Sequence, residues 1–223
     1  MDASLLKYPK KSHRKMVKLP EDSVELAEFM GIMAGDGGVS NPWQFAITVN
    51  SIADRIYAEY IKNLIFRLFK LEIRFMERER HALVIVCSST TVLDFLIDRG
   101  FTRGDKIRLG IGFPSWVHKK ASYEKAFVRG LMDTDGCLFI HKHRVAGKEY
   151  RNLGLTFTSF APGLVGGMAK ALQNNGITPH FSNDRRSIYL YKVESVVKYL
   201  SIFGSSNPRI TRKYEEWRGV RVA

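Results

Sequence analysis

Two aspartates, each followed by a glycine, are the residues of this sequence best suited to chemistry. Asp36–Gly37 lies near the end of the stretch ELAEFMGIMAGDGGV, and Asp135–Gly136 lies near the end of the similar stretch EKAFVRGLMDTDGCL. The two copies share Ala27, Gly31, Met33, Asp36 and Gly37 in the first and Ala126, Gly130, Met132, Asp135 and Gly136 in the second. A repeat with a carboxylate at the same place in each copy indicates a chain built from two halves, each of which supplies one acid.

Each repeated stretch is predicted to form a helix that ends at its acid. Residues 20–23 (PEDS) are typical of a helix start, and Ser122 is the N-cap expected for the second helix. Gly37 and Gly136 stand where a helix C-terminus favours a residue that tolerates the left-handed conformation, so each aspartate falls in a final turn. A carboxylate there faces the negative end of the helix dipole, at a cost of a few tenths to about 1 kcal/mol. We therefore expect a positive group to compensate.

Small side chains recur four residues apart on each predicted helix, as Gly31 and Gly35 and as Gly130 and Thr134. Strips of small side chains let two helix backbones approach closely, so we expect the two helices to pack together and their terminal acids to converge. Two carboxylates a few ångströms apart raise at least one pKa unless hard divalent cations lie between or beside them. The ordinary alternative is a helix that ends in Asp–Gly and carries a solvated surface acid.

The segments after each acid repeat the same order of elements. In the first half, the hydrophobic patterns predict a strand at 43–50, a helix at 51–70, a hairpin at 72–88 and a helix at 90–100. The matching segments of the second half are 137–144 and 152–159, 163–176, 177–191 and 193–203. Each half therefore reads helix, two strands, helix, two strands, helix, which predicts an α+β fold. We divide the chain into a basic N-terminal arm (1–19), a first half (20–105), a linker (106–121) and a second half (122–223).

The composition indicates a folded protein with a polyanionic partner. The 223 residues are 45% hydrophobic and carry 35 Lys and Arg against 22 Asp and Glu, a net charge of +13. This charge favours a nucleic acid partner, and a solvated basic surface is the alternative. No apolar stretch approaches the ~20 residues of a membrane span, and no signal-peptide core follows Met1, so we expect a soluble, intracellular protein. Cys87 and Cys137 lack metal-ligand spacing and are expected to be reduced, buried thiols.

The stretches FMGIMAGDG and VRGLMDTDG resemble the paired signature of the LAGLIDADG homing endonucleases. The resemblance covers nearly the whole chain and implies the family's monomeric, two-motif type, with pseudo-symmetric αββαββα halves and saddle-like antiparallel sheets. The divalent metal ligands that it implies are the carboxylates of Asp36 and Asp135 and the backbone carbonyls of Gly35 and Thr134, with Mg²⁺ or Mn²⁺ as the ion. The earlier acid of the motif is Asp133 in the second copy but Ala34 in the first. Because the family's metal ligand is the later acid, we expect cleavage to survive this departure, with some loss of symmetry between the halves.

The resemblance also implies two further pairs of catalytic residues. Asn50 and Ser159 stand where the second strand of each half ends, a place that commonly holds active-site water, and the equal alternative is that they cap strand-end turns. Lys106 resembles the family's solvent-polarising lysine, and Lys213 follows the second half as its counterpart. Either lysine alternatively contacts a phosphate.

The implied activity is a site-specific endonuclease that hydrolyses phosphodiesters on both strands of a long, asymmetric DNA target. Metal ions held at two acids activate water and stabilise the departing oxygen, so no covalent enzyme intermediate is needed. The resemblance implies cutting across the minor groove with short 3′ overhangs. The expected partner is double-stranded DNA of about two helical turns, with no membrane and no obligate protein partner.

Recognition is expected from the strands, because a curved sheet can enter the major groove and present alternate side chains to base edges. In the strand at 43–50, Phe45, Ile47 and Val49 face the core if Gln44, Ala46 and Thr48 face outward. Gln44 is suited to adenine. The other candidate DNA contacts are Thr48, Arg74, Arg78 and Arg80 in the first half and His141, His143, Arg144, Arg151, Arg185 and Arg186 in the second.

The stretch between the first two strands is longer in the second half, so we expect the two half-sites to differ. His141 and His143 are spaced like a zinc pair, but no third ligand is nearby in the sequence.

Three other functions share parts of this pattern. A DNA-binding regulator without cleavage has the same fold but does not need both terminal acids. An intron RNA maturase shares the basic surface. A structural basic protein binds DNA in a salt-sensitive way and never cuts it. An endonuclease inside an intein is disfavoured, because the sequence starts at Met1 and ends in RGVRVA without a His–Asn splice junction.

Overall fold

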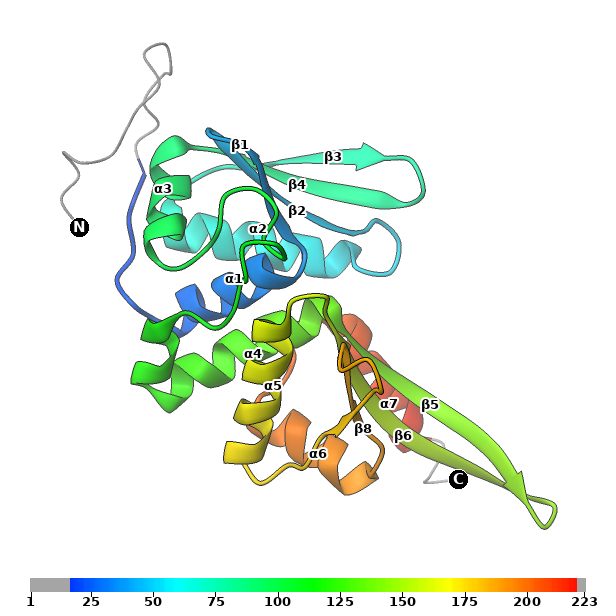
Figure 1. The fold of residues 1–223 in the computed structure, drawn as a ribbon. Coiled ribbons are helices and arrows are strands. Elements are labelled where there is room, and N and C mark those ends of the chain that lie inside the picture. The colour runs from blue at the N-terminus through cyan, green and yellow to red at the C-terminus, as the bar shows by residue number, and fades with distance from the viewer. Residues whose placement is uncertain (1–16, 220–223) are drawn as a thin grey trace.

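The computed structural model describes residues 17–219, and Figure 1 shows two halves that meet along a pair of helices. The first half contains α1 (Val24–Gly35), β1 (Gly37–Asn41), β2 (Gln44–Asn50), α2 (Arg55–Phe69), β3 (Arg74–Arg78), β4 (Ala82–Ser88) and α3 (Thr90–Asp98). The second half contains α4 (Ala121–Asp135), β5 (Gly136–Val145), β6 (Lys148–Thr158), α5 (Pro162–Asn174), β7 (His180–Phe181), β8 (Ser187–Leu190) and α6 (Val193–Ile202). The fold is α+β, and each half has the predicted order αββαββα. Of the predicted basic arm (1–19), only residues 17–19 lie within the described part of the chain.

Two elements lie outside the predicted repeat. The 3₁₀ helix η2 (Ser115–Lys119) follows α3, and the helix α7 (Pro208–Gly219) follows α6. The hydrophobic patterns did not predict α7, because only Ile210 and Trp217 of this strongly charged helix are buried. The indole Nε1 of Trp217 donates a hydrogen bond to the carbonyl oxygen of Arg151 at 3.0 Å, which holds α7 beside the β5–β6 hairpin.

Each half has a four-stranded antiparallel sheet, and the two strand orders, β1-β2-β4-β3 and β5-β6-β8-β7, are equivalent. Phe45, Ile47 and Val49 of β2 are buried, as the alternating pattern predicts, and Ile47 pairs with the buried Ile85 of β4. The helix α2 covers this inner face with the buried residues Tyr57, Ala58, Ile61, Leu64, Ile65, Leu68 and Phe69. The opposite face of the sheet, which carries alternate residues of β2, β4 and β3, forms an open groove that no helix within residues 17–219 covers.

The hairpin of β5 and β6 is longer than predicted. The prediction left residues 145–151 between the strands at 137–144 and 152–159, but the ladder continues to the end of the hairpin through the pairs Arg144↔Glu149 and Val145↔Lys148. The strands turn at Ala146 and Gly147, both of which have positive φ (49° and 78°), as a two-residue turn between twisted strands requires. The hairpin projects away from the rest of the second half (Figure 1).

Two local predictions are wrong. Ser23 caps α1 by accepting a hydrogen bond from the backbone N of Leu26 at 3.1 Å, but α4 begins at Ala121, before the predicted cap Ser122. Cys87 is buried as expected, whereas Cys137 is exposed, because β5 turns alternate residues to opposite faces and Leu138 takes the inner one. Between residues 17 and 219, none of the helices has the length and apolar character required to cross a bilayer.

Candidate active site

The helices α1 and α4 cross in direct backbone contact at the centre of the molecule. A Cβ added to Gly31 would overlap the carbonyl oxygen of Phe127, and one added to Gly130 would overlap the carbonyl oxygen of Glu28. Glycine is therefore required at both positions, because a backbone carbonyl cannot move aside as a side chain can. Further along, Gly35 lies against Thr134. The predicted strips of small residues thus hold the two halves together.

Both motif helices end at their acids and run directly into a strand. Asp36 is the C-cap of α1 (φ −86°, ψ −4°), and Asp135 is the last residue of α4. The prediction that a glycine in the left-handed conformation ends each helix is wrong. Gly136 is extended (φ −98°, ψ 159°), and Gly37 does not have a positive φ. Glycine is needed there for space: a Cβ on either residue would overlap the carbonyl oxygen four residues earlier.

The two acids converge where α1 and α4 end. A Cβ added to Gly35 would lie 3.4 Å from Cγ of Asp135, and Asp36 is close enough to Asp135 to interact with it electrostatically. Burial, and then the charge of Asp135, raise the pKa of Asp36 to about 7. Burial raises the pKa of Asp135 to about 6, with Lys106 acting in the opposite direction. The acids are therefore half-buried groups that interact with each other, and they are not fully solvated surface groups.

Lys106 is the positive group that compensates for these acids. Its Nζ donates to the carbonyl oxygen of Gly37 at 2.8 Å and also to that of Gly35. Burial lowers the pKa of Lys106, while Asp135 and Asp36 raise it. The carbonyls of a last helical turn have no intrahelical partner, so the ammonium group satisfies them and faces both carboxylates at once.

Arg209, which the sequence reasoning missed, occupies the corresponding place in the second half. Its Nη2 donates to the carbonyl oxygen of Gly136 at 3.4 Å, as Lys106 does to that of Gly37, and its Nε donates to Oδ1 of Asp54 at 3.1 Å. Lys213, the predicted counterpart of Lys106, lies one turn further along α7 and makes no hydrogen bond or ion pair to either acid in the described part of the chain. Lys106 and Arg209 follow α3 and α6 at similar distances, a spacing that could have identified Arg209.

The loop before α7 is held by Asp133, the acid that has no counterpart in the first motif. The carboxylate of Asp133 accepts hydrogen bonds from Oγ of Ser205 at 2.5 Å and from the backbone N of Ser206 at 2.7 Å. Burial raises the pKa of Asp133 to about 7, against the effect of these two hydrogen bonds. Nδ2 of Asn207 donates hydrogen bonds to Oδ1 of Asp54 at 2.9 Å and to the carbonyl oxygen of Asp133 at 3.0 Å. This network fixes the start of α7 and with it Arg209, which explains the asymmetry between the two motifs.

The two strand-end residues have different surroundings. Oδ1 of Asn50 accepts hydrogen bonds from the backbone N of Ile52 and Ala53, both at 2.9 Å, so its side chain caps the turn before α2. Ser159 accepts a hydrogen bond from the backbone N of Ala161 at 3.2 Å, and it lines a cavity of about 280 Å³ together with Gly35, Lys106 and Asp135.

The registers of the two sheets show that Asn50 and Ser159 are not equivalent. The pairs Gly37↔Ile47 and Gly136↔Phe157 place Thr48 opposite Asp36 and Thr158 opposite Asp135. The threonines therefore stand at matching positions beside the acids. Thr158, which sequence reasoning did not identify as a site residue, also lines the cavity.

The donor set suits a hard divalent cation. Two carboxylates, with the backbone carbonyls of Gly35 and Thr134 in the same turns, are all oxygen donors, and Mg²⁺ typically takes one or two carboxylates and fills its remaining positions with water and substrate phosphate. Within residues 17–219, no cluster of three or more His, Cys, Asp or Glu side chains forms a closed metal cage. The two acids and the two carbonyls thus fit a site whose remaining ligand positions are filled by water and substrate.

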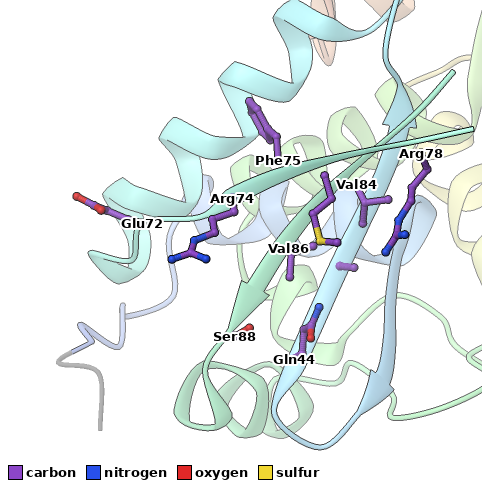
Figure 2. A pocket seen from close by; sticks show the side chains of 10 residues that line it. Gln44, Glu72, Arg74, Phe75, Arg78, Val84, Val86 and Ser88 are labelled. Carbon is purple, nitrogen blue, oxygen red and sulfur yellow. The ribbon is translucent and has the colours of Figure 1, made fainter. Parts of the chain in front are cut away.

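The outer face of the first sheet carries most of the predicted DNA contacts of that half. Gln44, Arg74 and Arg78 line an open groove of about 910 Å³, and Figure 2 shows them around the valines of β4. Thr48 lies on the same face, since it pairs with Val84. Arg80 lies in the turn between β3 and β4 and has a positive φ of 58°.

The predicted contacts of the second half are divided between two faces of the β5–β6 hairpin. His141 and His143 lie on the outer face and stack on each other, with ring centroids 5.4 Å apart. Arg144 and Arg151 point to the opposite face, because strand residues alternate, and Arg151 pairs with Glu216 of α7 at 3.6 Å. The histidine pair has no third ligand within residues 17–219, so nothing supports a zinc site there.

Arg185 and Arg186 lie near β8 and contact aromatic rings. The guanidinium of Arg185 lies 5.7 Å from the ring centroid of Phe181, and that of Arg186 lies 4.8 Å from the ring centroid of Phe160. Phe160 lines the same cavity as Asp135. Arg186 therefore lies against a residue that lines this cavity, whereas Arg185 lies in the turn before β8 and has a positive φ of 56°.

Comparison with known proteins identifies the fold. No family model and no curated protein sequence matches the chain. Among solved structures, the meganuclease I-SmaMI bound to uncleaveable DNA matches with a TM-score of 0.61 at 10% identity, over 90% of this chain and 91% of that one. The LAGLIDADG meganuclease I-AabMI bound to uncleaved DNA matches with a TM-score of 0.56 at 12% identity, over 83% and 86% of the two chains.

A third matching structure is described as a LAGLIDADG domain, without mention of an endonuclease. The N-terminal LAGLIDADG domain of DUF199/WhiA gives a TM-score of 0.54 at 15% identity, over 84% of this chain and 87% of that one. The chain therefore has the LAGLIDADG fold of the homing endonucleases, with both motifs in one chain, as the sequence resemblance predicts. At these identities, the fold leaves the activity to be argued from the site.

Proposed function

We propose that this protein is a site-specific, metal-dependent endonuclease that cuts both strands of double-stranded DNA. The observation that carries the proposal is the meeting of Asp36 and Asp135, one from each half, in a partly buried position beside Lys106. Two equivalent acids at a pseudo-twofold boundary match the two scissile phosphodiesters of a duplex. Because one chain supplies both acids, a second protein chain is not needed.

The site residues fall into two roles. Asp36, Asp135 and the carbonyls of Gly35 and Thr134 would hold Mg²⁺ or Mn²⁺, which when bound supplies Lewis-acid stabilisation of phosphoryl oxygens and lowers the pKa of water. Lys106 donates hydrogen bonds at the junction and carries a positive charge toward the reacting phosphates.

Arg209 supplies the corresponding positive charge from the second half. We therefore replace Lys213 with Arg209 in the proposed catalytic set. Thr48 and Thr158, which flank the two acids, are better placed than Asn50 to hold water near the scissile phosphates.

The two sheets supply the binding surface for a long target. The net charge of +13 fits a polyanion, and the matching structures of I-SmaMI and I-AabMI are complexes of those proteins with DNA. The outer faces of the two sheets differ in composition, with arginines and valines on the first and histidines and tyrosines on the second. The proposed target is therefore asymmetric, of about two helical turns.

The test is selection of cut products from a randomised duplex library in the presence of Mg²⁺, repeated with Asp36→Asn and Asp135→Asn. We expect one recurrent site that the wild-type protein cuts on both strands, with cutting lost in either variant and when EDTA removes the metal, while binding remains. A regulator of the same fold would bind a recurrent site without cutting it, and a maturase would prefer its intron RNA to duplex DNA in competition. Cutting that persists in both variants would contradict the proposal.

A further inference from the structure

The outer face of the first sheet has an apolar floor. Ala46, Val84, Val86 and Met76 line the groove of about 910 Å³, and Met76 is 40% exposed. The registers place them side by side: Ala46 pairs with Val86, and Val84 pairs with Met76. Paired residues point to the same face of a sheet, so these side chains form one continuous surface.

The floor has a rim of hydrogen-bonding and positively charged groups. Figure 2 shows Val84 and Val86 between Arg74 on one side and Arg78 on the other, with Gln44 nearby, while Phe75 points away toward α2. Arg74 and Arg78 are exposed and have no ion-pair or hydrogen-bond partner among residues 17–219. An apolar surface between unpaired guanidinium groups fits a polyanion that also carries methyl groups.

We propose that this floor reads the C5-methyl groups of thymines in the major groove of one half-site, an inference that rests on the proposed function. In the major groove, thymine alone presents a methyl group, and the other edge groups are hydrogen-bond donors and acceptors. An alanine, valine or methionine side chain placed against guanine, adenine or cytosine would desolvate those groups without offering a partner. The four side chains of the floor therefore favour thymine in two ways. They contact its methyl group, and they offer no hydrogen-bond partner to the edges of the other bases.

The dimensions of the floor fit a short run of base pairs. Val84 and Val86 lie two residues apart on β4, which corresponds to about 7 Å along a strand. Two base-pair steps of duplex DNA span about the same length. The floor thus covers about three adjacent base pairs, with Arg74 and Arg78 placed to reach guanines or phosphates at either side.

The preference is expected in the half-site that the first sheet covers, because the outer face of the second sheet is different. Within residues 17–219, its apolar part is Phe139, whose ring lies over Gly154. The outer face also carries stacked rings with polar edges, His141, His143 and Tyr150 on the hairpin and Tyr189 and Tyr191 beyond it. Imidazole and phenol groups donate and accept hydrogen bonds, so they do not select for a methyl group.

The experiment removes methyl groups from DNA without altering base pairing. Wild-type protein in EDTA selects a bound consensus from a randomised duplex library, and each thymine of that consensus is then replaced by deoxyuridine. We expect a thymine-rich stretch in one half-site, with an affinity loss of about fourfold for each contacted methyl group. Failure to select any consensus contradicts the proposed function itself. A consensus whose affinity is unchanged by uracil overturns only the methyl-reading inference.

A pair of variants assigns the effect to the floor. Val84 is half-buried, and Val84→Thr replaces one of its methyl groups by a hydroxyl and keeps the β-branched shape, so the strand is retained. We expect this variant to reduce the thymine-to-uracil ratio at one base pair from about fourfold to below about twofold and to leave the other positions unchanged. Val197→Thr on the exposed face of α6 is the matched control and should behave as wild type. A Val84→Thr variant that keeps the full ratio everywhere would overturn the proposal.

Discussion

Replacing a glycine by alanine is expected to have opposite effects at two helical positions of this protein. In a helix interior, alanine is intrinsically more stable than glycine by about 0.5–1 kcal/mol. In α5, a Cβ on Gly166 would meet no atom within 4 Å, so Gly166→Ala should gain that amount. In α1, a Cβ on Gly31 would overlap the backbone carbonyl oxygen of Phe127 and lie 2.9 Å from the backbone N of Leu131.

The conflict at Gly31 can be relieved only by moving α1 and α4 apart, because both neighbouring atoms belong to the backbone. Overpacking of this kind costs about 1–3 kcal/mol or more, which exceeds the intrinsic gain of alanine. We therefore expect Gly31→Ala to lower the free energy of unfolding by about 1–2 kcal/mol. For a chain of this size, each kcal/mol shifts Tm by about 2–4 °C. Gly31→Ala should thus lower Tm by about 2–8 °C, and Gly166→Ala should raise it by about 1–4 °C.

The assay is thermal unfolding followed by circular dichroism, with both variants and the wild type under the same conditions. DNA cleavage provides a second measurement, because separation of α1 and α4 also separates Asp36 from Asp135, and a displacement of about 1 Å can cost about 10²-fold in rate. A Gly31→Ala protein as stable and as active as the Gly166→Ala protein would refute the backbone contact between the halves.

Three further predictions concern the acids and the loop that supports Arg209. Because the pKa of Asp36 is raised from 3.8 to about 7, the folded protein binds more protons than the unfolded chain between these values, so the stability of the metal-free protein should fall as the pH rises through this window. Asp36→Asn should flatten that dependence and stabilise the metal-free protein at pH 8 by on the order of 1–3 kcal/mol in denaturant unfolding, and an unchanged pH profile would contradict the burial of this acid. Asn207→Ala removes hydrogen bonds to Asp54 and Asp133 at a buried position, so the free energy of unfolding should fall by about 1–3 kcal/mol, and an undiminished value in urea titration would count against the network. Arg209→Met should lower the rate of DNA cleavage by about 10²-fold in single-turnover assays, whereas Lys213→Met should change it by less than about threefold, and the reverse order would restore Lys213 as the catalytic residue.

Much of the framework could be predicted because it depends on local periodicity. The repeated apolar stretch with an acid at its end predicted two packed helices, and the alternation of Phe45, Ile47 and Val49 predicted the inner face of β2. The features that were wrong depend on details of packing. Glycine is required after each acid because a Cβ there would overlap atoms of Met33 or Met132, and not because the backbone makes a left-handed turn.

The sequence by itself determined the two-half architecture, the pair of acids and the basic character of the surface, because each of these follows from residue type and spacing along the chain. Tertiary structure alone decided that Arg209 contacts the carbonyl oxygen of Gly136 beside the acids and that Asp133 holds the loop before α7. It also decided that Arg151 points away from the outer face of its sheet and pairs with Glu216. These outcomes depend on which segments meet across long sequence separations and on the register of strands, where a shift of one residue moves a side chain to the opposite face.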